Sequence, residues 1–167
     1  MWLTPVVTAQ HLRPPQQSEG PAEYDVKAVF LLNFTRFVSW PAPERAGSPF
    51  AICVLGDDPF GDVLDRTVAG ETIGGRRLIV KRIRKWPESC EMLFVPAAQP
   101  SQASILAQAP RDVLTVGESP DFLADGGMIR FVVENRRVRF DINRNAVDRS
   151  SLMMSSRLFE VARTVLR

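Results

Sequence analysis

Apolar residues recur along the chain in two different patterns, and each pattern predicts a different kind of element. In residues 25–38 they return every three or four positions, which is typical of one face of an amphipathic helix. In residues 49–56 and 90–96 they follow one another and end at a glycine or a proline, which is typical of strands buried in a parallel sheet. The helix face expected in the core carries Val26, Val29, Phe30, Phe34 and Phe37.

Shorter patterns complete an alternation of helices and strands. Apolar and polar side chains alternate in residues 76–83, which predicts a strand near an edge of the sheet, and residues 112–117 predict a further strand. Residues 128–135 and 136–143 predict a hairpin that turns at Asn135. Helices are expected at residues 62–70, 101–109 (capped by Ser101), 119–126 and 146–166.

Buried strands that alternate with short helices favour a single α/β domain. We expect a mixed, mostly parallel sheet with helices on both faces, a Rossmann-like three-layer arrangement that ends in a β-hairpin and a helix. The length of 167 residues suits one domain. Hydrophobic residues make up 45% of the chain and charged residues 24%, both near globular averages, so a packed core is expected. We assign the domain to residues 24–167.

The first 23 residues differ in composition from the rest of the chain. Pro, Gln, Ser and Gly dominate after Gln10, which indicates a flexible leader. Val7-Thr8-Ala9 places small residues where a signal peptidase reads them. The segment is therefore either the remnant of a secretory signal that starts upstream of Met1 or a leader without that role, and the residues alone leave both open. No run of 18 or more apolar residues exists, so no membrane-spanning helix is expected in this chain.

The histidine content narrows the classes of function. The single histidine, His11, lies in the leader, whereas a Ser-His-Asp or Cys-His nucleophile system needs a histidine held by the fold. A zinc site built on histidine needs several. The chain also lacks the GxGxxG and P-loop motifs of nucleotide-binding proteins. We therefore expect no histidine-dependent nucleophile, no metal and no cofactor. The net charge of +2 is too small to indicate a nucleic-acid-binding protein.

The loop at residues 56–61 is the candidate site for a small ligand. It follows a buried strand and precedes a helix, which is where α/β proteins bind ligands. Two adjacent carboxylates, Asp57 and Asp58, suit a divalent ion. A helix cap and a first-turn acid explain the same two residues without a ligand, and this interpretation is favoured. A ligand-binding site would use Gly56, Asp57, Asp58 and Gly61.

Arginine is concentrated in the last quarter of the chain. The sequence has 18 arginines and 3 lysines, and residues 130–167 hold nine of these arginines with four acidic residues, a net charge of +5. Arg137 and Arg139 share a parity on the predicted hairpin and project from one face, and Arg130 lies on the preceding strand. Clustered arginines bind carboxylates or phosphates bidentately, although on charge alone a solvated basic face is the favoured explanation. We take Arg130, Arg137 and Arg139 as the candidate partner-binding residues.

The two cysteines, Cys53 and Cys90, form no CxxC pair and are either two buried thiols or one disulfide. Neighbouring strands lie about 4.8 Å apart, and bridged Cα atoms lie roughly 4.4–6.8 Å apart. A bridge is therefore reachable if the strands at residues 49–56 and 90–96 are neighbours in matching register.

Seven segments form an ordered series along the chain: VKAVFLLNFTRFVSWP, FAICVLGDDPFGDVL, GGRRLIVKRI, CEMLFVP, DVLTVG, FLADGGMIRFVVENRRVRFDIN and SSRLFEVAR. From Tyr24 to the C-terminus this series resembles the YfiR-like family of periplasmic regulators. The resemblance implies a secreted α/β protein, often dimeric, without enzymatic activity. It implies binding to the periplasmic domain of an inner-membrane diguanylate cyclase, which is held inactive, so that release raises cyclic di-GMP and promotes biofilm.

The same resemblance bears on the leader and the cysteines. It implies a signal peptide and an oxidising compartment, in which we expect Cys53 and Cys90 to form a disulfide. The favoured function is thus that of a periplasmic repressor, and we expect the protein to be a homodimer. A small-ligand sensor that uses the loop at residues 56–61 is the alternative, and an enzyme comes third.

Overall fold

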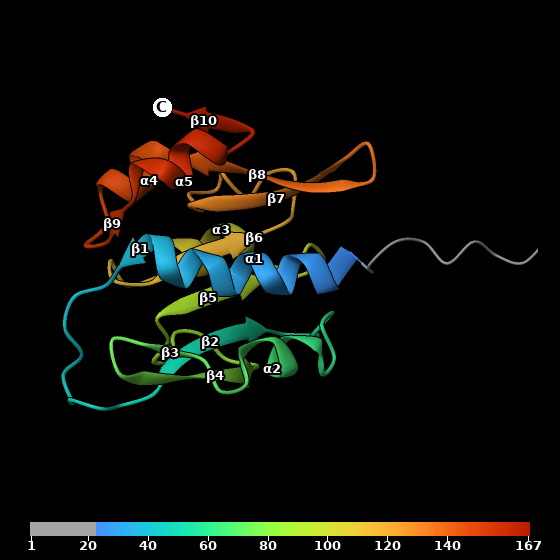
Figure 1. The fold of residues 1–167 in the computed structure, drawn as a ribbon. Helices are drawn as coiled ribbons and strands as arrows, with labels where there is room; N and C mark the ends of the chain where they lie inside the picture. The colour runs from blue at the N-terminus through green and yellow to red at the C-terminus, as the bar shows by residue number, and fades with distance from the viewer. Residues whose placement is uncertain (1–22) are drawn as a thin grey trace, which may run out of the picture.

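The computed structural model describes residues 23–167 (Figure 1). The leader, with the Val7-Thr8-Ala9 pattern and His11, lies outside the described residues. Within the described part of the chain, no helix is long and apolar enough to cross a membrane.

An eight-stranded sheet forms the centre of the domain, in the order β10-β8-β7-β6-β5-β2-β4-β3. The strands β2, β4, β5, β6 and β7 run parallel, whereas β8 is antiparallel to β7 and β3 is antiparallel to β4. This mixed, mostly parallel sheet confirms the predicted fold class. The bounds are β2 Phe50–Leu55, β3 Thr72–Ile73, β4 Arg76–Ile83, β5 Met92–Val95, β6 Leu114–Gly117, β7 Ile129–Glu134, β8 Arg137–Asn143 and β10 Thr164–Leu166.

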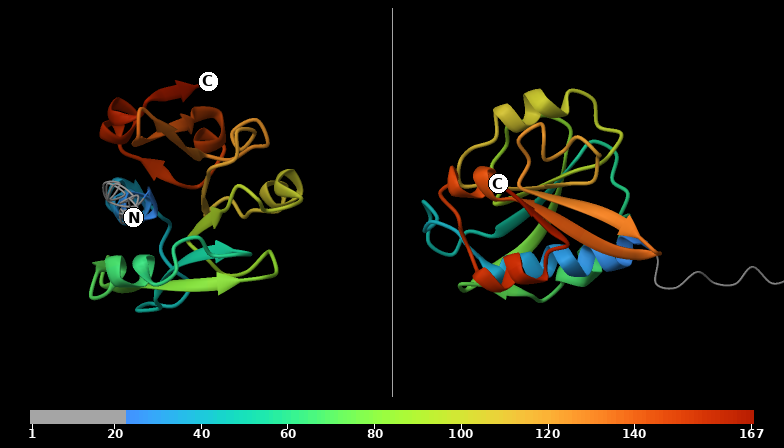
Figure 2. Two further views of the ribbon diagram at one scale, coloured as in Figure 1. Left: turned by 90° about the vertical axis from the view of Figure 1, so that its right-hand side faces the viewer. Right: turned by 90° about the horizontal axis from the view of Figure 1, so that it is seen from above.

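Helices cover both faces of the sheet, as predicted. Helices α1 (Glu23–Phe37) and α2 (Val63–Val68) lie on one face, and α3 (Gln102–Ala107) lies on the other (Figure 2, left). Each face has its own hydrophobic core: one is built around Phe34 and Phe94, and the other around Leu93 and Phe122. Every residue of β2 is buried, which explains its uninterrupted apolar run.

Helix α1 packs through a face that differs from the predicted one. Phe34 is buried as expected, but Val29 is 50% exposed and Phe37 is 37% exposed. Ala28 and Leu31 are fully buried instead. The helix contacts α2, α5 and β8, so several of its sides are covered and the side toward the sheet is set by these neighbours. The prediction of the buried face was therefore wrong in part, because one apolar stripe cannot show which neighbours surround a helix.

The C-terminal segment is not the single helix predicted for residues 146–166. It forms α4 (Arg144–Asp148), β9 (Met153–Met154), α5 (Ser156–Val161) and β10. Asn143 and Ser155 cap the two short helices through their side chains, and β9 pairs with β1 (Val38–Ser39) while β10 joins the sheet. Caps and strand pairing outweigh helix propensity here, because tertiary contacts decide the conformation of short segments.

Two smaller predictions also differ from the structure. Residues 119–126 form turns rather than a helix, and the Phe122 ring fills the space where a Cβ on Gly117 or Gly127 would lie, within 2.3 Å or less. Ser101 precedes α3 with a left-handed φ of 61° and its side chain makes no capping hydrogen bond. The hairpin turn at Asn135 is confirmed: Asn135 and Arg136 have φ values of 51° and 62°, as in a two-residue type I′ turn.

The Cys53–Cys90 disulfide is confirmed. Strands β2 and β5 are neighbours, and Cys90 stands two residues before β5, with its Cα 6.0 Å from that of Cys53. The bridge closes a loop of 37 residues, which corresponds to about 4 kcal/mol of stabilisation by restriction of the unfolded chain.

Candidate functional site

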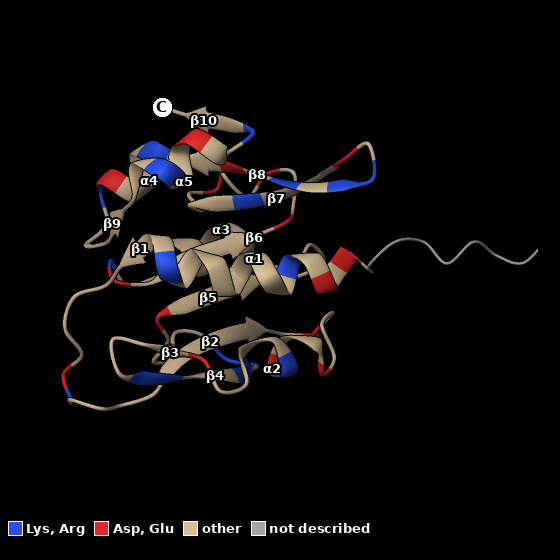
Figure 3. Cartoon of the chain, in the orientation of Figure 1, with Lys and Arg blue, Asp and Glu red and all other residues tan. Residues whose placement is uncertain are grey.

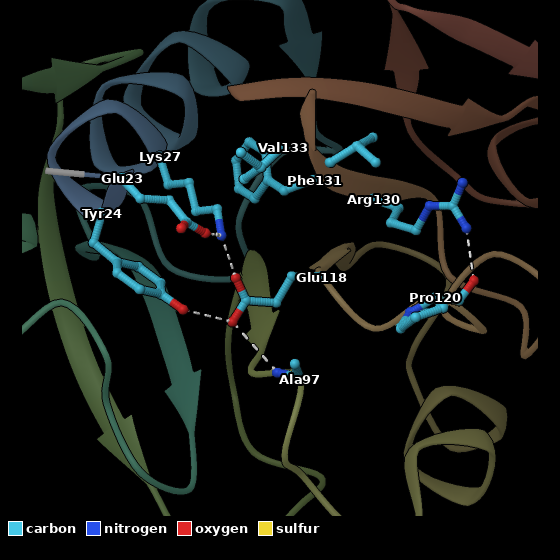
Figure 4. A pocket seen from close by; sticks show the side chains of 10 residues that line it. Glu23, Tyr24, Lys27, Ala97, Glu118, Pro120, Arg130, Phe131 and Val133 are labelled. Carbon is cyan, nitrogen blue, oxygen red and sulfur yellow. Dashed lines mark hydrogen bonds and ion pairs between the residues drawn. The ribbon is translucent and has the colours of Figure 1, made fainter. Parts of the chain in front are cut away.

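A cavity of about 370 Å³ opens at the carboxyl ends of the parallel strands. Its walls come from the first turns of α1, the segments that follow β5 and β6, and β7 (Figure 4). This edge of a parallel sheet is where α/β proteins bind ligands. The lining residues are Glu23, Tyr24, Lys27, Ala97, Glu118, Pro120, Arg130, Phe131, Val132 and Val133.

A buried ion pair closes one side of the cavity. The Nζ atom of Lys27 lies 2.6 Å from Oε2 of Glu118, and the two side chains are 3% and 7% exposed. Glu23, one turn earlier on α1, also pairs with Lys27 but is 45% exposed. Burying a charge costs several kcal/mol unless it is paired, so the two carboxylates offset the cost of burying the Lys27 side chain.

Tyr24 completes this cluster. Its hydroxyl donates a hydrogen bond of 3.0 Å to Oε1 of Glu118, and its ring packs edge-on against Phe60 at 5.3 Å. The backbone N–H of Ala97 donates to the same carboxylate oxygen at 3.4 Å. Burial, followed by the negative charge of Glu118, raises the pKa of Tyr24 above its ordinary value. The phenol therefore stays a neutral donor.

A second ion cluster lies on the hairpin. Asp141 of β8 is 1% exposed and accepts a hydrogen bond of 2.6 Å from Arg130, while Arg163 donates two, at 2.9 and 2.7 Å. Burial opposes ionisation, but the hydrogen bonds from Arg163 and Arg130 hold the pKa of Asp141 below its ordinary value. Arg130 also donates to the carbonyl of Pro120 at 2.6 Å. The cluster ties β7, β8 and the start of β10 together.

The three candidate arginines lie on one face of the hairpin but differ in their surroundings. Arg130 is held in this internal cluster, whereas Arg137 and Arg139 are exposed on β8. These two lie opposite Glu134 and Val132 of β7, on the hairpin face that also carries Asp141. Figure 3 shows basic residues along β8 where the hairpin projects beyond the body of the domain.

The loop at residues 56–61 is held by arginines of β4 and of the segment after it. Asp58 accepts hydrogen bonds from Arg82 at 2.7 Å and from the N–H of Phe60 at 2.7 Å, and Asp57 pairs with Arg84 at 2.9 Å. The Gly61 carbonyl also accepts from Arg82.

Gly56 has a left-handed φ of 76°, and a Cβ there would lie 2.2 Å from the side-chain amide of Gln99. The residues that line the cavity between α1 and β7 described above do not include Gly56, Asp57, Asp58 or Gly61. Across residues 23–167, no three His, Cys, Asp or Glu side chains gather as metal ligands would.

The cluster of Tyr24, Lys27 and Glu118 was not predicted from the sequence. Lys27 carries one available signal, because it is one of only three lysines and lies within an apolar helix. Glu118 directly follows a buried strand. The two residues are 91 positions apart, so the pairing itself leaves no trace in the sequence.

Comparison with known proteins is consistent with the resemblance described above. A family model described as YfiR/HmsC-like matches residues 24–163. A search of curated proteins finds no match. The matched family supports a periplasmic regulator of a diguanylate cyclase, and it is regulatory rather than catalytic.

Proposed function

The chain belongs to the YfiR/HmsC-like family, and from this premise we propose that it represses a membrane diguanylate cyclase by binding the periplasmic domain of that enzyme. Repression lowers cyclic di-GMP in the cell and with it the formation of biofilm. The protein itself catalyses no reaction in this scheme. It acts by binding one state of the cyclase more tightly than the other, since only a difference in affinity can shift an equilibrium.

The exposed arginine pair on the hairpin is the observation that carries the proposal. Arg137 and Arg139 project from one face of β8, and guanidinium groups bind carboxylates bidentately. The internal cluster around Asp141 fixes the strands below them, so the pair is presented on a rigid base. Such pre-organisation reduces the entropy lost on binding.

Exposed apolar side chains supply the rest of the proposed surface. Phe37 of α1 and Val161 of α5 are 37% and 62% exposed, and both line a second cavity of about 270 Å³. A partner that covers them gains apolar burial at roughly 25 cal/mol per Å².

The proposal includes export and assembly. A disulfide in the domain fits an oxidising compartment such as the periplasm. Export requires a signal peptide, for which the Val7-Thr8-Ala9 pattern is the candidate cleavage region. We propose that the exported protein is a homodimer, which size-exclusion chromatography with light scattering tests.

Deletion of the gene is expected to raise cellular cyclic di-GMP, and the wild-type gene is expected to restore the lower level. A variant with Arg137→Glu and Arg139→Glu is expected to fail in this complementation while it stays folded, because charge reversal repels a carboxylate-bearing partner. The matched control reverses two exposed arginines elsewhere, Arg66→Glu with Arg77→Glu, and should repress normally. Normal repression by the hairpin variant would contradict the assignment and place the interface on the helices.

A further inference from the structure

The cavity between α1 and β7 has an excess of negative charge that the repressor role does not use. Glu23 and Glu118 share the single ammonium group of Lys27. Arg130 also lines the cavity, but its guanidinium is directed to Asp141 and to the Pro120 carbonyl (Figure 4). Glu23, Glu118 and Lys27 together therefore carry a net charge of −1, whereas Arg130 places its positive charge on the side of the cavity wall that faces Asp141 and Pro120.

The most accessible of these charges is a carboxylate. Lys27 and Glu118 are 3% and 7% exposed, so a molecule that enters meets little of either, whereas Glu23 is 45% exposed. The raised pKa of Tyr24, caused by burial and then by Glu118 and Glu23, agrees with a negative potential at this place. Among the described lining residues, the charged group that an entering molecule meets first is therefore the Glu23 carboxylate, since Arg130 is 21% exposed and is bound by Asp141 and the Pro120 carbonyl.

The remaining walls are mostly apolar. Phe131, Val132, Val133 and Pro120 line the cavity, and Val133, near the turn of the hairpin, is 51% exposed. A volume of about 370 Å³ lies within the range of small-molecule sites, which run from roughly 300 to 1,000 Å³. An apolar body fits these walls, and a single positive charge fits the carboxylate at the mouth.

We propose that this cavity binds a small organic monocation, with its ammonium group at the Glu23 carboxylate and its apolar body against Phe131 and Val133. This binding goes beyond the repressor role and does not depend on it. A divalent metal ion is a poorer occupant, because the described residues bring no three metal-ligating side chains together.

Two probes with the same body and opposite charges test the proposal: 2-phenylethylammonium and phenylacetate. Both are titrated into the oxidised, folded protein and followed by calorimetry and by amide chemical shifts. The cation is expected to bind, with shifts at Glu118 and at Phe131–Val133, and phenylacetate is expected to bind at least about tenfold more weakly.

Two variants and a control locate the binding. Glu23→Gln is expected to weaken binding of the cation about twofold to fivefold, because it removes a half-exposed carboxylate from the proposed ion pair. Val133→Lys adds a positive charge at a half-exposed position that tolerates a polar side chain, and it should also weaken binding. Glu44→Gln, an exposed carboxylate between β1 and β2, should change nothing. Equal affinity for both probes, no binding of the cation at millimolar concentration, or unchanged affinity in both variants would overturn the proposal.

Discussion

Replacement of Lys27 by methionine tests how the buried cluster stabilises the domain. The substitution keeps an unbranched side chain, shorter by one heavy atom, and removes the ammonium group that Glu118 and Glu23 share. Removing one partner of a buried ion pair costs about 3–5 kcal/mol. Glu118 keeps hydrogen bonds from Tyr24 and Ala97, so we expect the lower end, about 3 kcal/mol. For a domain of this size that lowers Tm by about 6–12 °C.

A double-mutant cycle separates the ion pair from lost packing. Glu118→Gln alone is expected to cost about 1–2 kcal/mol, since Lys27 keeps Glu23 and the amide still accepts from Tyr24. With both substitutions no buried charge is left uncompensated, so the combined loss should be at least about 1.5 kcal/mol smaller than the sum of the single losses. Urea unfolding followed by circular dichroism measures all three variants.

The exposed pair of Arg66 and Asp62 on α2 serves as the control. These side chains are 68% and 76% exposed, so Arg66→Met should change the free energy of unfolding by less than about 0.5 kcal/mol. A loss below about 1 kcal/mol for Lys27→Met, or additive losses in the cycle, would refute the interpretation of Lys27 and Glu118 as a coupled buried pair.

Three further predictions concern titration and the disulfide. Tyr24 is the single tyrosine, so absorbance at 295 nm should show no phenolate in the folded protein at about pH 11, whereas the unfolded chain titrates near pH 10. The free energy of unfolding should therefore fall as the pH rises above about 10 towards the higher pKa of the folded state. Because the pKa of Asp141 is lower in the folded than in the unfolded state, Asp141 stabilises the fold above its unfolded pKa of about 3.9, and this stability is lost as the pH falls through the folded pKa. In Asp141→Asn the urea midpoint should therefore fall less steeply at acid pH than in the wild type. Cys53→Ala with Cys90→Ala should lower the free energy of unfolding by about 4 kcal/mol, and equal urea midpoints would contradict the role given to the bridge.

Local patterns were enough to predict the central strands and the hairpin. Residues 49–56 and 76–83 became β2 and β4 with nearly the predicted bounds. A strand with a continuous apolar run must be buried on both faces of the sheet, and a strand with alternating residues must be buried on one face. The pattern along the strand therefore predicts how many of its faces are buried. The turn at Asn135 was predictable because few residues adopt a left-handed backbone readily.

Long-range contacts decided what these patterns could not show. The segment at residues 146–166 has a helical apolar period, yet pairing of β9 with β1 and of β10 with β8 divides it. Likewise the neighbours of α1 determine that Ala28 and Leu31 are buried while Val29 is exposed. A short segment gains more from strand hydrogen bonds and burial than helix propensity offers, and those partners lie far away in the sequence.

The candidate sites, too, were predictable from the sequence in part and otherwise depended on long-range contacts. The arginine content of residues 130–167 and the parity of Arg137 and Arg139 were visible in the sequence, because strand geometry alone puts alternate residues on one face. That Arg130 is held by Asp141, and that Lys27 meets Glu118 across 91 residues, was decided only by the packing of α1 and β8 against their neighbours. Charges are buried only where the fold supplies a partner, and the fold, not the local sequence, brings those partners within hydrogen-bond distance.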